Sequence, residues 1–471
     1  MYKTTIGLEV HAELSTKSKM FCGCKNDPHA GEPNAYTCPV CLAHPGTLPV
    51  PNQEAILKVL LFGKAVNAVQ ADFSEFDRKN YFYPDIPKAY QISQYAYPLL
   101  KGGELAGVAL TRVHLEEDTA RSQHDHDGVS LVDFNRAGVP LMELVTEPVI
   151  HDAETAGRFA RELQLLLKTL KISGAQMERG EMRVEANISV SKTDVLGTKV
   201  EVKNLNSFKS VEGAIKYEVA RHIELLEKGG SVVQETRGWD EVRLKTFTQR
   251  VKETAKDYRY FPDPDIPKLK TNDYEPFSKA RLAEMMPELP QDKRIKYTNL
   301  GIPSNQIEVL LAEPSMSEYF GRVLAVGTTS QSPELAKLAA NYLTSDIQAL
   351  ILSGKTLKLR ADYFVSLITM ISQAKISSRV AKDLLAEIVE SDADPEELAR
   401  SRGLLQVSNP EELRACIEQV ISENREVVAE YQAGKESALQ YLLGQAMKAT
   451  RGAANPNVLR ETLKQILVET R

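Results

Sequence analysis

Several signals that identify common protein classes are missing from this 471-residue sequence. No apolar run reaches the about 18 residues that a membrane helix needs, and the first residues form no apolar signal-peptide core. We therefore expect a cytoplasmic protein with no membrane association. The formal net charge is −6, so no overall basic charge indicates nucleic acid, although a basic patch on one domain would suffice.

Two sequence motifs of catalysis are absent as well. Because there is no Gly-x-x-x-x-Gly-Lys-Ser/Thr motif, any ATP site is not a P-loop. There is no Gly-x-Ser-x-Gly nucleophile elbow either, and Ser377-Ser378 lacks an adjacent lysine. We therefore expect no amidase chemistry from this chain.

Cysteine is scarce and unevenly distributed. Four of the five cysteines form the pairs Cys22-Gly-Cys24 and Cys38-Pro-Val-Cys41, with 13 residues between the pairs. Disulfides are disfavoured in the cytoplasm, and two such pairs match a tetrahedral Zn²⁺ site. We predict a structural zinc in a zinc-knuckle-like insertion, residues 22–41; the alternative is four reduced, unliganded thiols.

The character of the sequence changes near residue 290. Before it, short alternating segments and turn clusters predict an α+β domain, residues 1–292; after it, apolar residues recur at helical spacing and predict an all-α domain, residues 293–405. Ser408-Asn409-Pro410 is a good helix start and opens a last small helical unit, residues 406–471.

One segment has an internal echo: residues 81–88 (YFYPDIPK) recur as residues 260–268 (YFPDPDIPK). Proline and aspartate at this density exclude regular strands and helices. The echo indicates either two similar rigid loops with stacked aromatic rings or two loops that face one cleft.

Alternating segments in the first domain carry the residues suited to chemistry. In residues 5–14, Glu9 and His11 point to the same side of a strand whose other side is apolar. Three more segments have such polar faces: Arg112, His114 and Glu116; Arg183, Glu185, Asn187 and Ser189; Lys199, Glu201 and Lys203. The alternative is the ordinary solvated side of antiparallel strands, but those usually carry lysine, threonine and serine rather than carboxylates and histidine.

Clustered carboxylates repel one another unless a cation lies among them, so these faces predict a magnesium site. Histidine is an unusual ligand for so hard a cation, and it either binds the cation or supports a residue that does. We predict Mg²⁺ between Glu9, His11, Glu116 and Glu185, with Lys79, Lys203 and Asn204 nearby for phosphate.

Longer motifs resemble one family over nearly the whole chain. They are residues 6–11 (IGLEVH), 38–42 (CPVCL), 77–85 (DRKNYFYPD), 88–94 (KAYQISQ), 114–118 (HLEED), 133–136 (DFNR), 202–207 (VKNLNS), 257–262 (DYRYFP) and 444–456 (GQAMKATRGAANP). In this order they are similar to the B subunits of the aspartyl/glutamyl-tRNA amidotransferase, the GatB/GatE family.

The resemblance implies a cradle-like antiparallel β domain with helices, an all-α helical domain and a small YqeY-like tail domain that binds tRNA. It implies a ligase that uses ATP and Mg²⁺ to convert Glu-tRNA(Gln) to Gln-tRNA(Gln), or Asp-tRNA(Asn) to Asn-tRNA(Asn). It also implies an A subunit that makes ammonia from glutamine, and a small C subunit.

Roles for particular residues follow from these motifs and faces. We predict catalytic roles for Glu9, His11, Lys79, Glu116, Lys203 and Asn204, substrate or phosphate contacts for Lys79, Asn80, Tyr83, Arg136 and Asn187, and tRNA contacts for Lys435, Lys448 and Arg451. The alternative for the last three is a charged, solvated helix end. Arg451 stands where the family has lysine, and Glu185 where it more often has aspartate.

Two rival functions stay open at this point. One is a metal-dependent phosphotransferase or nuclease that works alone, which would be active as a single purified chain. The other is a scaffold that holds tRNA and partner subunits without chemistry of its own, for which substitution of Glu9 or Glu116 would be neutral.

Overall fold

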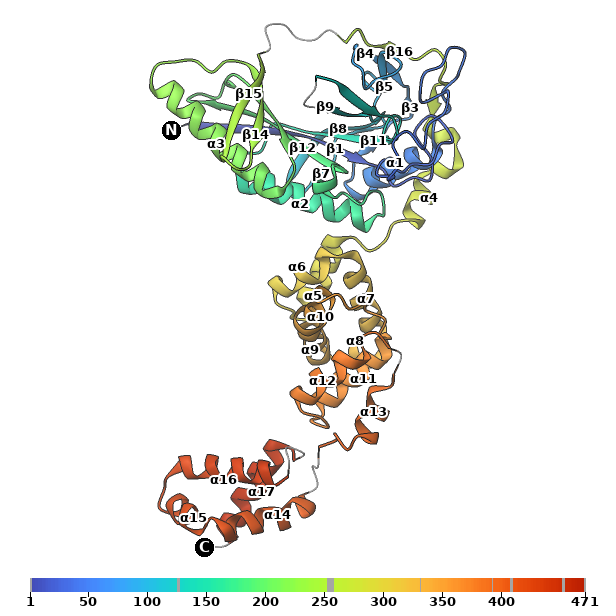
Figure 1. Cartoon of the computed structure of the whole chain (residues 1–471). Helices are drawn as coiled ribbons and strands as arrows, with labels where there is room; N and C mark the ends of the chain where they lie inside the picture. Colours follow the sequence, from blue (N-terminus) through green and yellow to red (C-terminus); the bar gives the residue numbers. More distant parts are fainter. Residues whose placement is uncertain are drawn as a thin grey trace. The chain divides into compact units, whose positions relative to one another are not determined.

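A computed structural model describes residues 2–124, 128–251, 258–330, 332–391, 393–406, 410–450 and 454–469. The chain divides into two compact units, residues 1–290 and 291–471 (Figure 1). The first is rich in strands and the second is helical, which confirms the predicted α+β class. The division into three domains at residues 292 and 405 stays a prediction.

A ten-stranded sheet forms the centre of the first unit, in the order β15-β14-β13-β12-β1-β11-β8-β6-β2, with β7 paired to β8. Its strands are β1 (Lys3–Glu13), β2 (Val69–Gln70), β6 (Leu100–Lys101), β7 (Glu104–Leu105), β8 (Val108–Glu117), β11 (Pro140–Thr146), β12 (Met182–Ser191), β13 (Val200–Leu205), β14 (Glu235–Asp240) and β15 (Lys245–Val251). The sheet is antiparallel, as predicted, except that β13 and β14 are parallel. A helix connects these two strands, because a parallel pair needs a crossover.

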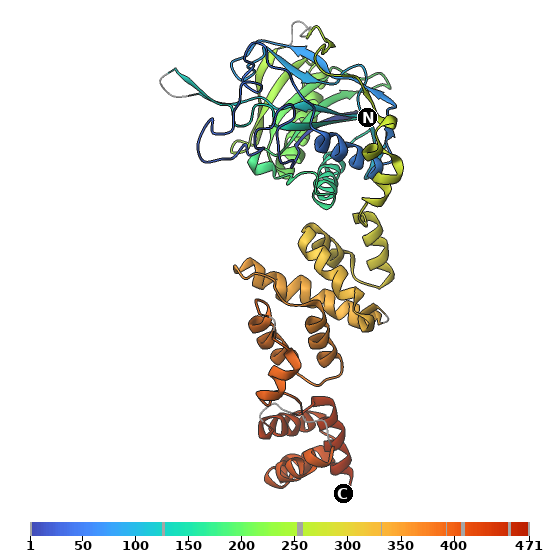
Figure 2. The same cartoon turned by 90° about the vertical axis from the view of Figure 1, so that its right-hand side faces the viewer.

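Helices cover one face of this sheet. They are α1 (Gln53–Ala65), α2 (Ala153–Thr169) and α3 (Phe208–Glu227), and α1 and α2 lie on the same side of the sheet in both views (Figures 1 and 2). Asn52, Asp152 and Ser207 cap their N-termini by accepting from backbone amides of the first turn. The apolar side chains of the strands and helices form one core between them, which leaves the other face of the sheet polar.

Three small sheets complete the first unit: β16 (Phe261–Pro262), β4 (Asp77–Asn80) and β5 (Tyr90–Ser93); β9 (Arg121–His124) with β10 (Ser130–Asp133); and β17 (Leu269–Lys270) with β3 (Phe73–Ser74). The pairing of β16 with β4 brings the second echo segment to the strand that leads into the first. Two residues of the second segment therefore form a short strand where the sequence predicted none. The short helix α4 (Lys279–Glu284) follows.

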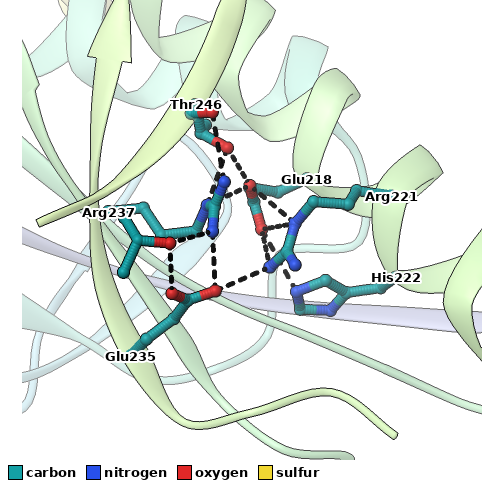
Figure 3. A network of polar contacts seen from close by, with 7 residues as sticks. Glu218, Arg221, His222, Glu235, Arg237 and Thr246 are labelled. Atoms are coloured by element: carbon teal, nitrogen blue, oxygen red, sulfur yellow. Dashed lines mark hydrogen bonds and ion pairs between the residues drawn. The ribbon is translucent and has the colours of Figure 1, made fainter. Parts of the chain in front are cut away.

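A buried ionic network joins α3 to β14 and β15 beneath the edge of the large sheet (Figure 3). The Glu218 carboxylate lies 2.7 Å from Arg221 Nη2 and 3.1 Å from Arg237 Nε, and it also accepts from the Thr246 hydroxyl. Burial opposes the charge of Glu218, but the hydrogen bonds from His222, Arg221 and Thr246 lower its pKa to about 2.

In the described part of the second unit, the regular elements are helices. They are α5 (Pro290–Asn299), α6 (Ser304–Ala312), α7 (Pro314–Ala325), α8 (Gly327–Ser330), α9 (Pro333–Tyr342), α10 (Gln348–Leu352), α11 (Ala361–Ser372), α12 (Ser378–Ile388), α13 (Pro395–Ser401), α14 (Pro410–Glu423), α15 (Arg425–Gln432), α16 (Glu436–Ala449) and α17 (Pro456–Glu469). The last four share a core of their own, centred on Ile417, Leu442 and Leu463. Among the described residues, no helix is long and apolar enough to cross a membrane.

We expect Glu218→Gln to reduce the stability of the first unit in a pH-dependent way. Because the folded-state pKa is depressed from 4.5 to about 2, the charge stabilises the fold above pH 4.5, and this stabilisation is lost as the pH falls through 2. The difference in free energy of unfolding from wild type should be on the order of 3 kcal/mol at pH 7 and shrink steadily below pH 4.5.

Urea unfolding followed by the fluorescence of Trp239, the only tryptophan, measures this difference within the first unit. Glu224→Gln, an exposed position on the same helix, is the control and should change little. A Glu218→Gln effect of equal size at pH 7 and pH 3 would contradict the ionic account.

Candidate active site

The polar face of the large sheet is the floor of a cleft of about 510 Å³. Its walls come from β1, β4, β8, β11, β12, β13 and the segment that leads into β16. Of the predicted site residues, Glu9, His11, Lys79, Glu116, Glu185 and Lys203 all line it. These six are half of the charged and histidine residues that line the cleft, and they come from five strands far apart in the chain.

Strand register decides which of these residues meet. Glu9 of β1 stands opposite Glu185 of β12, and His11 stands opposite Glu143 of β11. Glu143 in turn stands opposite His114 of β8. Since side chains of directly opposite residues lie close together on one face, two neighbouring rows of acidic and basic groups cross the sheet.

The first row ends in a cluster of His11, Glu116 and Glu143. His11 Nε2 lies 3.4 Å from Glu143 Oε2 and 3.7 Å from Glu116 Oε1, and Ser93 donates to Glu116 Oε2 at 3.1 Å. Burial disfavours the charge of His11, but Glu143, Glu116 and Glu185 together raise its pKa to about 9. Burial likewise opposes the charge of Glu143, yet the charge of His114 and the hydrogen bond from His11 hold the Glu143 pKa well below its usual range.

The second row ends in a cluster of Glu9, Glu185 and Glu201, whose candidate ligand oxygens lie within 4.8 Å of one another. Lys203 Nζ lies 2.7 Å from Glu185 Oε2 and 3.2 Å from Glu201 Oε1. Asn187 donates to Glu9 Oε1 at 2.8 Å, so this predicted substrate residue supports a carboxylate of the cluster. Burial raises the pKa of Glu185 against the opposing effect of Lys203 and His11.

The structure therefore separates the four predicted magnesium ligands into two groups. His11 and Glu116 belong to one cluster, and Glu9 and Glu185 belong to the other. Each cluster contains one carboxylate that was not among the predicted ligands. Glu143 could have been found as the one charge in the apolar strand β11, and Glu201 was already on a predicted polar face.

Tyrosines and a lysine form the opposite wall of the cleft. Lys79 Nζ lies 5.1 Å from the ring centre of Tyr258, and the rings of Tyr95 and Tyr260 are stacked with centres 4.3 Å apart. Burial disfavours the charge of Lys79, but Glu116, Tyr260 and Glu143 raise its pKa, so the lysine is a cation at neutral pH. Tyr81 of the first echo segment and Tyr260 of the second both line the cleft, so the echo gives two loops that face one cleft.

Five residues predicted for this site lie outside the lining of the cleft: Asn187, described above, and Asn80, Arg136, Tyr83 and Asn204. Asn80 donates to the backbone oxygens of Tyr258 and Arg259 at 3.2 and 2.8 Å, which fixes the tyrosine segment. Arg136 donates to two backbone oxygens just after Asp118. Tyr83 is 63% exposed, and Asn204 is exposed with φ of 63° next to a register shift between β12 and β13.

Oxygen donors dominate both clusters, which suits a hard divalent cation. Three buried polar atoms of this face have no partner among the described residues: Arg112 Nε, His114 Nδ1 and Asn187 Oδ1. Unpaired buried polar atoms are costly, and a divalent cation with phosphate oxygens would give these atoms partners. The residues present therefore fit Mg²⁺ and phosphate.

The four cysteines Cys22, Cys24, Cys38 and Cys41 converge, with sulfur atoms within 4.8 Å of one another. Hydrogen bonding from Cys22 lowers the pKa of Cys41 to about 5, against the effect of burial. Lys19 Nζ lies 3.9 Å from Cys41 Sγ, where its charge would offset that of four thiolates. This arrangement is a possible metal site, and its donors fit zinc.

Two of the three predicted tRNA contacts, Lys435 and Lys448, lie at the two ends of α16. Lys435 precedes α16 and pairs with Glu430 at 2.8 Å, and Lys448 is exposed in the last turn of α16. Arg451 lies outside the described residues.

Comparison with known proteins identifies the class. Residues 4–275 match the model of the GatB/GatE catalytic domain, and residues 318–467 match that of the GatB domain. Two proteins that are named as the B subunit of the aspartyl/glutamyl-tRNA(Asn/Gln) amidotransferase, from a Thermoanaerobacter species and from Thermus thermophilus, are 41% and 43% identical, each over 99% of both chains. The protein of the same name from Brevibacillus brevis is 39% identical over 99% of both chains.

These matches and the acidic cleft define one component of a carbon–nitrogen ligase of translation that acts with tRNA and partner subunits. The chain belongs to the GatB/GatE family, the B subunits of the aspartyl/glutamyl-tRNA(Asn/Gln) amidotransferase. The resemblance drawn from the sequence motifs is confirmed.

We expect Asn204 to act through its backbone rather than through its amide. Its φ of 63° is a conformation that asparagine and glycine adopt at a lower energetic cost than alanine. Asn204→Gly should retain amide formation, whereas Asn204→Ala should destabilise the first unit by about 1 kcal/mol. Amide formation by the assembled enzyme, measured with urea unfolding, tests this; loss of activity in Asn204→Gly would show that the amide itself contacts substrate.

We expect the purified chain to hold about one zinc ion, because all four thiols face one point. Cys41→Ser should lose the metal and lower the melting temperature of the first unit, while Cys416→Ser, far from the cluster in sequence, should keep both. Elemental analysis and thermal melting measure these effects. Four freely reactive thiols in metal-replete protein would favour the alternative of unliganded cysteines.

Proposed function

We propose that this chain carries the ATP-dependent activation and the amidation of the aminoacyl group on tRNA. The substrate is Glu-tRNA(Gln), Asp-tRNA(Asn) or both. The observation that supports this most strongly is the pairing of two acidic clusters with Lys79 and Lys203 in one cleft. Acidic and basic groups together suit a reaction that moves a phosphoryl group between anions.

The reaction needs activation because a side-chain carboxylate does not react with ammonia. Its oxygen attacks the γ-phosphorus of ATP, an O–P bond forms, and the bond to ADP breaks. Ammonia then attacks the acyl carbon, the C–O bond to phosphate breaks, and the nitrogen loses a proton to leave the amide. Phosphoryl transfer of this kind depends mainly on positioning and charge neutralisation.

The residues of the cleft divide these tasks. The clusters His11–Glu116–Glu143 and Glu9–Glu185–Glu201 would each hold a divalent cation, and Mg²⁺ when bound would neutralise phosphate oxygens. Lys79 and Lys203 would contact the transferred phosphate, because both present an ammonium group to the cleft.

The tyrosine wall would limit access of water to the bound substrate, which matters because an acyl phosphate hydrolyses readily. The members of this wall are Tyr81, Tyr95, Tyr258 and Tyr260.

Partners supply what this chain lacks. Since no amidase nucleophile is recognisable in the sequence, the A subunit would deliver ammonia from glutamine, and a small C subunit would complete the enzyme. The tail domain would hold tRNA through Lys435, Lys448 and Arg451. A compartment with aminoacyl-tRNA is required, so we place the enzyme in the cytoplasm.

We expect Glu116→Gln and Glu201→Gln to lower amide formation at least about 100-fold, because each removes one charge from a cation cluster. The assay uses chain co-expressed with A and C subunits, labelled Glu-tRNA(Gln) and Asp-tRNA(Asn), glutamine, ATP and Mg²⁺. Glutamine hydrolysis and tRNA binding should persist. Glu104→Gln, an exposed carboxylate of the same unit, is the matched control.

Each rival function gives a different result in this assay. Unchanged amide formation in both variants would favour the scaffold. ATP turnover by the single chain without partners, lost in Glu116→Gln, would favour an independent phosphotransferase.

A further inference from the structure

Strand β14 presents different chemistry on its two faces. Arg237 stands opposite Val202 in the neighbouring strand, on the core side of the sheet, while Thr236 stands opposite Glu201, on the cleft side. Thr236 Oγ1 donates to Glu201 Oε2 at 2.8 Å, and the two side chains are buried, with exposed fractions of 7% and 8%. The Thr236 hydroxyl thus fixes one oxygen of Glu201, a carboxylate of the second cluster.

The core side of β14 is fixed by the ionic network of Figure 3. Arg237 Nη1 lies 2.7 Å from Glu235 Oε1, and Arg237 Nε lies 3.1 Å from Glu218 Oε1 on α3. Glu235 also lies 3.5 Å from Arg221 of α3. Because the residues on either side of Thr236 are both bound in this network, the backbone at Thr236 has little freedom to shift.

Glu201 needs such support, because its two oxygens face different partners. Oε1 lies 3.2 Å from Lys203 Nζ, and Oε2 accepts from Thr236. Without the hydroxyl, Glu201 Oε2 would lose this hydrogen bond and the terminal torsion of Glu201 would be less restricted, since such sp³–sp² torsions have broad energy wells. The carboxylate would then turn away from Glu9 and Glu185 for part of the time.

We propose that Thr236 is a positioning residue: its hydroxyl, on a strand that the Arg237 network immobilises, orients Glu201 for cation binding. This inference rests on the proposed function, in which Glu201 helps to hold a divalent cation. Residues that orient metal ligands commonly change metal affinity about 10–100-fold when they are lost. Thr236 has no role in contacting the reacting groups, so its effect appears as a change in cation affinity.

The test is Mn²⁺ binding to the assembled three-subunit enzyme, followed by electron paramagnetic resonance of free Mn²⁺. Thr236→Val keeps the shape of the side chain and removes the hydroxyl; we expect Mn²⁺ affinity to fall about 10-fold or more. Thr236→Ser restores the hydroxyl and should bind Mn²⁺ within about 3-fold of wild type. The Mg²⁺ concentration for half-maximal amide formation should rise in Thr236→Val and stay near the wild-type value in Thr236→Ser.

The matched control is Thr271→Val. Thr271 is also buried, and its hydroxyl donates to the backbone oxygen of Ala71, outside both the cleft lining and the Arg237 network, so its loss should lower the melting temperature and leave Mn²⁺ affinity unchanged. If Thr236→Val fails to assemble, Thr236→Ala takes its place, with the melting temperature measured for each variant.

Glu201→Gln distinguishes a failure of the positioning role of Thr236 from a failure of the cation site. If Glu201→Gln weakens Mn²⁺ binding and the folded Thr236→Val or Thr236→Ala variant does not, the positioning role of Thr236 is wrong and the cation site stands. If Glu201→Gln binds Mn²⁺ as wild type does, the assignment of this cluster as a cation site fails first.

Discussion

The site depends on the register of four antiparallel strands. β8, β11, β1 and β12 lie side by side, and their pairing sets His114, Glu143 and His11 in one row and Glu9 and Glu185 in the next. A slip of one residue in β1 would turn Glu9 and His11 into the core and Leu8 and Val10 into the cleft. The burial of those apolar residues therefore enforces the geometry of the charged ones.

This register carries an electrostatic cost that the surrounding residues reduce. Carboxylates that meet within 4.8 Å repel one another in the absence of a cation. The positive charge of Lys203 offsets the negative charge of the second cluster, and His11 does the same in the first. The carboxylates around His11 raise its pKa for this reason. The ionic network of α3 and β14 holds the edge of the sheet where Glu201 is supported. The ion pairs on the core face of β14 thus support the position of a carboxylate on the cleft face.

Much of this was accessible from the sequence. Period-two alternation predicted the polar faces that carry Glu9, His11, Glu116 and Glu185, and the motifs predicted the family. Separation into two clusters could not be predicted, because it depends on which strands are neighbours and in what register. Thr236 was not found for the same reason, since its role comes from the parallel pairing of β13 with β14. The left-handed backbone of Asn204 was not visible in the sequence either, and its role toward phosphate stays a prediction.

The central claim is that the acidic cleft performs the phosphorylation of the aminoacyl group. Its most direct test is transfer of label from γ-labelled ATP to Glu-tRNA(Gln) or Asp-tRNA(Asn) in the assembled enzyme without glutamine or ammonia. The account predicts a labelled, base-labile acyl phosphate on tRNA in wild type and none in Glu201→Gln. Equal labelling of wild type and Glu201→Gln, or amide formation by wild type with no labelled tRNA at any time, would contradict it.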